Sequence, residues 1–157
     1  MRALVRMDDD EVAAFVAANL RARVATLNRD GSPHVVPVTY VVLDGQITFW
    51  ADNDSLKMVN LRRDPRVAAV VDDGVDFQEL RGVEVTGTAE LRDDEVTNDR
   101  VADLFAAKAP EEHRLAAKEM LLSLATERTA VVIRAGNVAS WDHRKLAGAA
   151  RPQDLGH

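Results

Sequence analysis

Residues 34–51 have the sequence HVVPVTYVVLDGQITFWA, in which two runs rich in β-branched and aromatic side chains lie on either side of Asp44-Gly45. An Asp-Gly pair between such runs favours a type I′ turn, which joins two antiparallel strands. The stretch therefore predicts a strand over residues 34–43, a tight turn, and a returning strand over residues 46–51.

The rest of the chain adds strands to this hairpin. Residues 23–28 predict a short strand, and Gly31 in the turn that follows can take a positive φ, so we expect a three-stranded meander. Alternating or β-branched patterns predict three more strands, over residues 66–72, 80–92 and 129–134. Gly82 and Gly87 lie inside the longest of these and predict a bulge or a tight bend. Tight hairpins without a βαβ rhythm favour an α+β, mainly β fold: a six-stranded antiparallel barrel with flanking helices.

Helices are predicted around these strands. Asp8 and Glu11 have the spacing of an acidic capping box at the start of a helix over residues 9–20. A short helix begins at residue 54 or 55 and ends near residue 64, because Pro65 disfavours helical geometry in the residue before it. Two more helices precede the last strand. We expect the helices to cover the open end and the edges of the barrel.

Composition bounds the class of protein. The 157 residues suffice for one domain, which we expect over residues 1–146, with a flexible C-terminal tail over residues 147–157. A net charge of −6 and 4% aromatic residues argue against a nucleic-acid partner. The chain has no cysteine for disulfides or thiolate sites, and no apolar run near the roughly 18 residues that span a membrane. We therefore expect a cytoplasmic protein without a membrane partner.

Several catalytic motifs are absent. The chain contains no G-x-G-x-x-G after a strand, no G-x-x-x-x-G-K and no G-x-S-x-G, which excludes the usual dinucleotide, P-loop and α/β-hydrolase sites. The histidines stand at positions 34, 113, 143 and 157, and none pairs with another at metal-ligand spacing. We therefore expect no metal.

Two neighbouring features could hold a flat anionic ligand. Ser55 and Lys57 lie at the start of the short helix, where free backbone N–H groups favour a phosphate. The alternative is an ordinary N-cap followed by a solvated lysine. Pro37 interrupts a strong strand and belongs on an edge or beside an open groove, against which a flat ring could lie. The alternative is a plain edge-strand proline.

The other candidates lie outside these features. Arg62, Arg63 and Arg66 fit a helix end whose charges complement the dipole, although one of them could meet an anionic ligand tail. Residues 140–146, SWDHRKL, combine aromatic and basic side chains that could stack on and grip a flat ligand; the alternative is a tryptophan that packs a chain terminus. Phe77 could form a rim of the same pocket or belong to a simple hairpin connection.

The order of these segments resembles a known superfamily. Residues 55–67, SLKMVNLRRDPRV, resemble the S-x-K-x-x-N-L-R-x-D-P-R-V segment of the split β-barrel flavin and deazaflavin oxidoreductases, the pyridoxamine 5′-phosphate oxidase-like superfamily. The hairpins over residues 25–45 and the strand over residues 80–90 are similar to that family's opening and central strands. Residues 140–146 resemble a closing motif of the B group of deazaflavin-dependent reductases. The resemblance covers about residues 10–146.

This resemblance implies a six-stranded split barrel that forms a homodimer with two cofactor sites at its interface. Ser55, Lys57 and Asn60 would help hold the cofactor and its phosphate. The ring would lie along the second strand and beside the end of the strand that leads into the short helix, near Val36, Pro37, Val38, Trp50, Ala51 and Asp52. The partner subunit would contribute Phe77, Trp141, His143 and Lys145.

Two departures bear on the cofactor. True pyridoxamine phosphate oxidases end in an Arg-Leu-His-Asp-Arg type motif and carry a basic residue on the second strand, whereas residues 35–41 of this chain hold no Lys or Arg. The resemblance therefore favours coenzyme F420 over FMN, and a reductase that passes a hydride from the reduced deazaflavin to an unsaturated small molecule. An FMN-dependent oxidase or reductase, or a non-catalytic protein that binds a tetrapyrrole or the cofactor, stays as an alternative. The catalytic residues are not assigned; Tyr40 and His143 are candidates for a proton donor, and solvent is another source.

Overall fold

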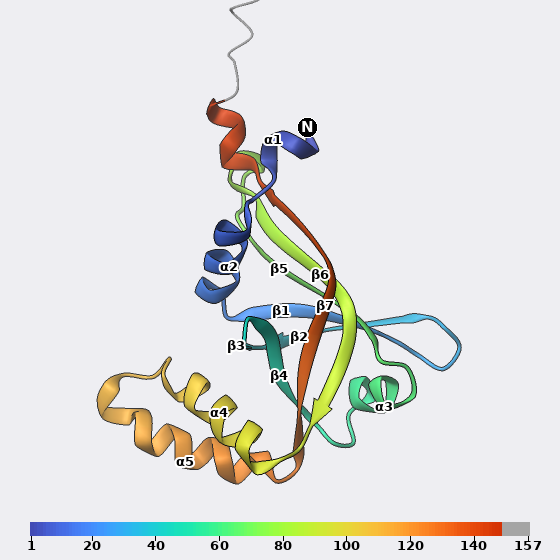
Figure 1. The fold of residues 1–157 in the computed structure, drawn as a ribbon, viewed down its shortest axis with the longest axis vertical. Coiled ribbons are helices and arrows are strands. Elements are labelled where there is room, and N and C mark those ends of the chain that lie inside the picture. The colour runs from blue at the N-terminus through green and yellow to red at the C-terminus, as the bar shows by residue number, and fades with distance from the viewer. Residues whose placement is uncertain (149–157) are drawn as a thin grey trace, which may run out of the picture.

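A single antiparallel sheet organises the computed structural model, which describes residues 1–148. Its strand order is β2-β1-β5-β6-β7-β4-β3, seven strands where the sequence predicts six. The strands are β1 (Arg21–Leu27), β2 (Pro33–Thr39), β3 (Val41–Leu43), β4 (Gln46–Asp52), β5 (Arg66–Asp73), β6 (Arg81–Arg92) and β7 (Arg128–Asp142). The sheet curls around one core and leaves a split barrel, as Figure 1 shows. The predicted fold class is confirmed, and the extra strand is a minor difference.

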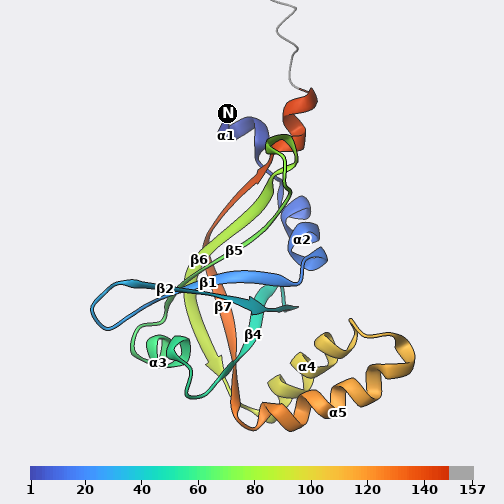
Figure 2. The same cartoon turned by 180° about the vertical axis from the view of Figure 1, so that it is seen from behind.

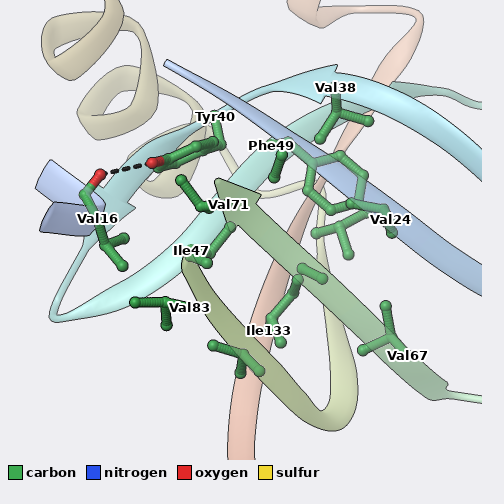
Figure 3. Packing of buried hydrophobic residues seen from close by; sticks show 14 of the residues in the cluster. Val16, Val24, Val38, Tyr40, Ile47, Phe49, Val67, Val71, Val83 and Ile133 are labelled. Atoms are coloured by element: carbon green, nitrogen blue, oxygen red, sulfur yellow. Dashed lines mark hydrogen bonds between the residues drawn. The ribbon is translucent and has the colours of Figure 1, made fainter. Parts of the chain in front are cut away.

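The seventh strand arises at Tyr40, where the predicted strand over residues 34–43 divides. The N–H of Tyr40 donates to the carbonyl of Leu20 (3.1 Å), and its buried hydroxyl donates to the carbonyl of Val16 (2.5 Å), as drawn in Figure 3. The chain therefore leaves β2, which pairs with β1, and enters β3, which pairs with β4. The predicted three-stranded meander is wrong, because β4 pairs with β7 and the two hairpins lie at opposite ends of the strand order.

Turns and bulges follow the predicted glycines. Asp44 and Gly45 both have positive φ, 50° and 78°, which confirms the hairpin turn between β3 and β4. The pairing of β6 with β7 shifts register between Thr86 and Gly87. A Cβ at Gly87 would overlap the carbonyl of Arg134, so only glycine permits this close approach. The predicted bulge is confirmed.

The core fills the inside of the curl. Val24, Phe49, Val71, Val83 and Ile133 are fully buried and face one another across five strands (Figure 3). A second, smaller cluster forms where α4 packs on β3 and β7. Its buried members are Val41, Leu43, Val101, Ala130 and Val132. Because side chains alternate along a strand, β7 contributes Val131 and Ile133 to the main core and Ala130 and Val132 to the second cluster.

The helices lie at the ends and edges of the sheet. The capping box between Asp8 and Glu11 is confirmed at the start of α2, which ends at Ala18, two residues before the prediction. The helices are α1 (Arg2–Val5), α2 (Asp9–Ala18), α3 (Leu56–Arg63), α4 (Glu95–Ala106) and α5 (Arg114–Ala125), with 3-10 turns η1 (Phe77–Glu79), η2 (Glu111–His113) and η3 (His143–Gly148). Helices α4 and α5 pack against each other beside the lower end of the sheet in Figures 1 and 2. No helix of residues 1–148 is long and apolar enough to cross a membrane.

The C-terminal part of the chain departs most from the prediction. Strand β7 continues to Asp142, well past the predicted end at Arg134, because it keeps pairing with the first half of β6. Residues 147 and 148, predicted to begin the tail, belong to η3. The rest of the predicted tail, residues 149–157, lies outside the described residues.

Candidate functional site

Strand β2 is an edge of the sheet within the described chain. It pairs with β1 on one side, and no strand of residues 1–148 pairs with its other side. Pro37 is exposed on this strand, opposite Arg23, as its missing N–H requires. Val36 and Val38 turn the other way, half-buried and buried respectively. The predicted open edge is confirmed, with its apolar side chains divided between two faces.

The first turn of α3 has no side-chain cap. Ser55 is the N-cap residue, but its hydroxyl donates backward to the carbonyl of Asp52 (2.7 Å). Unbonded N–H groups at a helix start carry partial positive charge and attract anions. The turn is therefore available to an acceptor that the chain itself does not supply.

Lys57 lies in this first turn and is half-buried. Its ammonium makes no hydrogen bond or ion pair with any described residue of the chain. Two nearby charged residues do have partners within the chain: Asp52 pairs with Arg128 (3.0 Å), and Arg62 donates to the carbonyl of Asn53 (2.7 Å). Helix α3 packs on β1, the strand that pairs with β2. We call Ser55, Lys57 and the open edge of β2 together the anion corner.

Asn60, one turn beyond Lys57, fastens α3 to β1. Its amide nitrogen donates to Thr26 Oγ1 (3.1 Å) and Asn28 Oδ1 (3.0 Å), and its oxygen accepts from Arg63 (3.2 Å). The side chain is 1% exposed, so these bonds satisfy a buried amide. This bonding is structural, and a contact of Asn60 with a cofactor stays a prediction.

The three arginines of the 62–66 segment all have partners in the chain. Arg62 and Arg63 donate to backbone carbonyls, of Asn53 and Leu27. Arg66 pairs with Asp64 (2.7 Å), and the hydrogen bonds from Arg66 lower the pKa of that carboxyl to about 2. The geometry thus agrees with arginines that close a helix end, and contact with a ligand tail is untested.

His34 is a residue that the sequence reasoning missed. It stands opposite Thr26 in the β1–β2 pair, on the face that Asn60 of α3 contacts. Its Nδ1 is the one buried side-chain polar atom without a partner that residues 1–148 contain. A buried polar atom is normally satisfied by protein, water or ligand, so this orphan fits a bound polar group beside the anion corner. The sequence feature that could have pointed to His34 is the alternation of β2, which puts residues 34, 36 and 38 on one face.

The three predicted site residues at the end of β4 lie in three different environments. The indole N–H of Trp50 donates to Asn98 Oδ1 (3.0 Å), and its ring lies 5.7 Å from that of Phe105 on α4. Ala51 is buried in the main core, and Asp52 is exposed. Trp50 therefore contacts α4 in this chain, and its contact with a cofactor stays a prediction.

The remaining predicted residues gather at the opposite end of the molecule, which we call the tip. Phe77 of η1 and His143 of η3 pack together with ring centroids 4.5 Å apart. Trp141 lies over Gly82, where any Cβ would overlap its ring. Lys145 donates to Glu11 (2.7 Å) and to the carbonyl of Arg6 (2.8 Å). Figures 1 and 2 both show η3 at one end of the long axis and α3 towards the other, so one chain does not unite the tip with the anion corner.

Two chemical roles can be assessed directly. Burial raises the pKa of Tyr40 to about 12, and its proton is already donated to Val16. Tyr40 is therefore a core residue rather than a proton donor. Residues 1–148 contain no group of three or more metal-ligating side chains.

Comparison with known sequences identifies one family. The sequence model of the pyridoxamine 5′-phosphate oxidase family matches residues 8–142. A search of curated proteins found no match. The conserved hypothetical protein Rv2991 from Mycobacterium tuberculosis has a similar structure, with 34% identity, a TM-score of 0.84, and coverage of 100% of this chain and 97% of that one.

More distant structures share the fold. A protein named F420 reductase matches with a TM-score of 0.57 and 18% identity, over 80% of this chain and 94% of that one. An FAD-binding protein, mll6688 from Mesorhizobium loti, matches with a TM-score of 0.59 and 22% identity, over 85% of this chain and 94% of that one. At these identities the likeness establishes the fold alone.

Proposed function

Because the chain belongs to the pyridoxamine 5′-phosphate oxidase family, we propose that it is a reductase dependent on coenzyme F420. It would pass a hydride from the reduced deazaflavin to an electron-poor, unsaturated small molecule. The observation that carries the proposal is the anion corner: a lysine without a partner among the described residues, in an uncapped turn of a helix that packs on β1, the neighbour of the edge strand β2.

The electrostatics of the anion corner support a phosphodiester. A phosphomonoester such as that of FMN has a second pKa near 6 and carries about −1.5 to −2 charges at pH 7, whereas a phosphodiester carries about one. Lys57 is the one lysine or arginine of the anion corner and has no partner among the described residues, and residues 33–39, which form β2, contain no Lys or Arg. One ammonium and the partial charges of a helix turn match a monoanion. This supports F420 over FMN.

Each part of the corner has a role toward the bound coenzyme, which supplies the hydride. Lys57 and the first-turn N–H groups would hold the phosphodiester. The free backbone groups of β2 would hydrogen-bond the edge of the ring, and Val36 would exclude water from one of its faces. The orphaned Nδ1 of His34 gives a further polar contact at the same side of α3.

A homodimer is part of the proposal. Residues 134–139 of β7 are all exposed, and this part of β7 pairs with β6 alone, because its pairing with β4 ends at Val132. A strand segment that is exposed on both faces and has one unpaired edge favours a protein partner. A second copy would cover it and bring its tip, with Phe77, Trp141 and His143, to the anion corner of the first.

The test is a fluorescence titration of the purified protein with F420 and, separately, with FMN. We expect quenching that saturates with F420 at a concentration at least tenfold below that required for FMN. Tight FMN binding without F420 binding would overturn the proposal. Binding of F420 without turnover of any hydride acceptor would instead leave a cofactor-carrying protein, and would refute the reductase.

A further inference from the structure

The tip holds a histidine whose hydrogen bonding selects one tautomer. His143 Nδ1 lies 2.7 Å from the backbone carbonyl oxygen of Phe77. A carbonyl oxygen accepts but cannot donate, so the ring nitrogen that faces it carries the hydrogen. In the neutral ring, Nε2 is then the atom with the free lone pair.

The ring is held in place from several sides. The backbone N–H of His143 donates to the carbonyl of Leu80 (2.9 Å), and the Phe77 ring packs against the imidazole. The preceding residue, Asp142, is buried and paired with Arg144 (2.7 Å). These contacts restrict rotation of the ring, as acid–base catalysis requires of a proton-transferring group.

The opposite nitrogen is free. Nε2 of His143 makes no hydrogen bond with any described residue, and the side chain is half-exposed. Three ion pairs lie on or beside the elements packed around it: Asp142 with Arg144, Lys145 with Glu11, and Arg81 with Asp73. Glu79 of η1 and Arg2 of α1 form no ion pair with any described residue. Protonation at Nε2 therefore leaves the Phe77 bond and these ion pairs intact.

We propose that His143 is the catalytic proton donor of the reductase, acting through Nε2. The inference rests on the proposed function, including the homodimer, because η3, which begins at His143, lies at the other end of the molecule from α3. Hydride addition to one carbon of an electron-poor C=C bond places the π electron pair on the neighbouring carbon. The Nε2 proton of the imidazolium is transferred to that carbon, the substrate gains two electrons and two hydrogens, and the neutral imidazole recovers its proton from water.

Two variants separate proton transfer from structure. His143→Asn retains an N–H at the position of Nδ1, so it preserves the bond to Phe77 while removing the acid. His143→Ala removes both and opens space for added imidazole. Long-range ¹H–¹⁵N spectra of the wild-type imidazole report the tautomer without any cofactor.

We expect the wild-type spectrum to show a protonated Nδ1 and an unprotonated Nε2 in the neutral ring. We expect His143→Asn to keep the melting temperature and the F420 dissociation constant, and to lose about 100-fold in kcat, the lower end of the range for general acid catalysis. Added imidazole should restore part of the kcat of His143→Ala, which a purely structural residue would not permit.

The outcomes distinguish this inference from the proposed function. An Nε2-protonated neutral ring, or a His143→Asn variant with wild-type kcat, would overturn the role of His143 and leave the F420 reductase standing. A wild-type protein that does not bind F420 would overturn the proposed function, and the role of His143 with it.

Discussion

The anion corner and the tip each contain a lysine that the family resemblance assigns to the cofactor, but the two lysines differ in what the chain has already bound to them. Lys145 at the tip contacts Glu11 and the carbonyl of Arg6. Lys57 has no partner among the described residues. An ammonium that is already paired must give up its partner to bind a new anion, whereas an unpaired one does not. Lys57 is therefore the stronger candidate of the two for an anion-binding group.

The largest effect is expected from removing the open charge. Lys57→Ala should weaken F420 binding by about 1.5–3 kcal/mol, the scale of a hydrogen bond to a charged group, which is roughly 10- to 150-fold in the dissociation constant. Lys145→Ala is the matched control and should weaken binding much less. Fluorescence titration of both variants measures this. Equal losses, or no loss in Lys57→Ala, would contradict the comparison.

Turns and helix starts could be predicted from the sequence more accurately than the pairing and the ends of the strands. Asp44-Gly45 specified its hairpin, and Ser55 the start of α3, because these signals depend on neighbouring residues alone. Tyr40 divides a strand because its hydroxyl reaches Val16, and no pattern within residues 34–43 encodes that long-range contact. The sequence places Trp141 past the predicted last strand, whereas pairing with β6 extends β7 to include it.

For the site residues too, positions could be predicted from the sequence but side-chain partners could not. The positions of Ser55 and Lys57 at a helix start were predictable from spacing. The pairing of Lys145, the internal bonding of Asn60 and the orphaned Nδ1 of His34 all depend on side chains that are distant in the sequence. For these residues only the packed structure distinguishes a satisfied polar group from a free one.

The second expected effect concerns the stability of the tip. Asp142→Asn should lower the free energy of unfolding by about 1–2 kcal/mol, because a buried carboxylate loses its charge-assisted bonds to Arg144, discounted for the exposure of the arginine. Arg66→Ala breaks an exposed pair at the other region and should cost less. Urea unfolding of the two variants is the measurement, and a greater loss in Arg66→Ala would reverse the assignment.

A smaller effect is expected at Tyr40, where the chain passes from β2 to β3. Tyr40→Phe removes the bond to Val16 and should cost about 1 kcal/mol of stability. Its turnover should equal that of the wild type, because the hydroxyl faces the core. A loss of kcat at unchanged stability would place Tyr40 in the chemistry after all.

The smallest effect is a dependence of stability on pH. The hydrogen bonds from Arg144 hold the pKa of Asp142 below its usual 3.8 in the folded chain. A carboxyl with a depressed folded pKa contributes stability above its unfolded pKa and loses that contribution as the pH falls through the folded value. We expect the melting temperature to fall below about pH 4, and to fall less steeply in Asp142→Asn. Parallel slopes in circular-dichroism melts of the two proteins would exclude this contribution.

The most direct test of the account is a crystal structure of the protein with bound F420. We expect the phosphodiester to lie within hydrogen-bonding distance of Lys57 Nζ and the first turn of α3, and the deazaflavin ring to lie along β2. A coenzyme bound elsewhere, for example in the cavity of about 760 Å³ lined by Asn53, Asn98 and Arg128 between β4, α4 and α5, would contradict it.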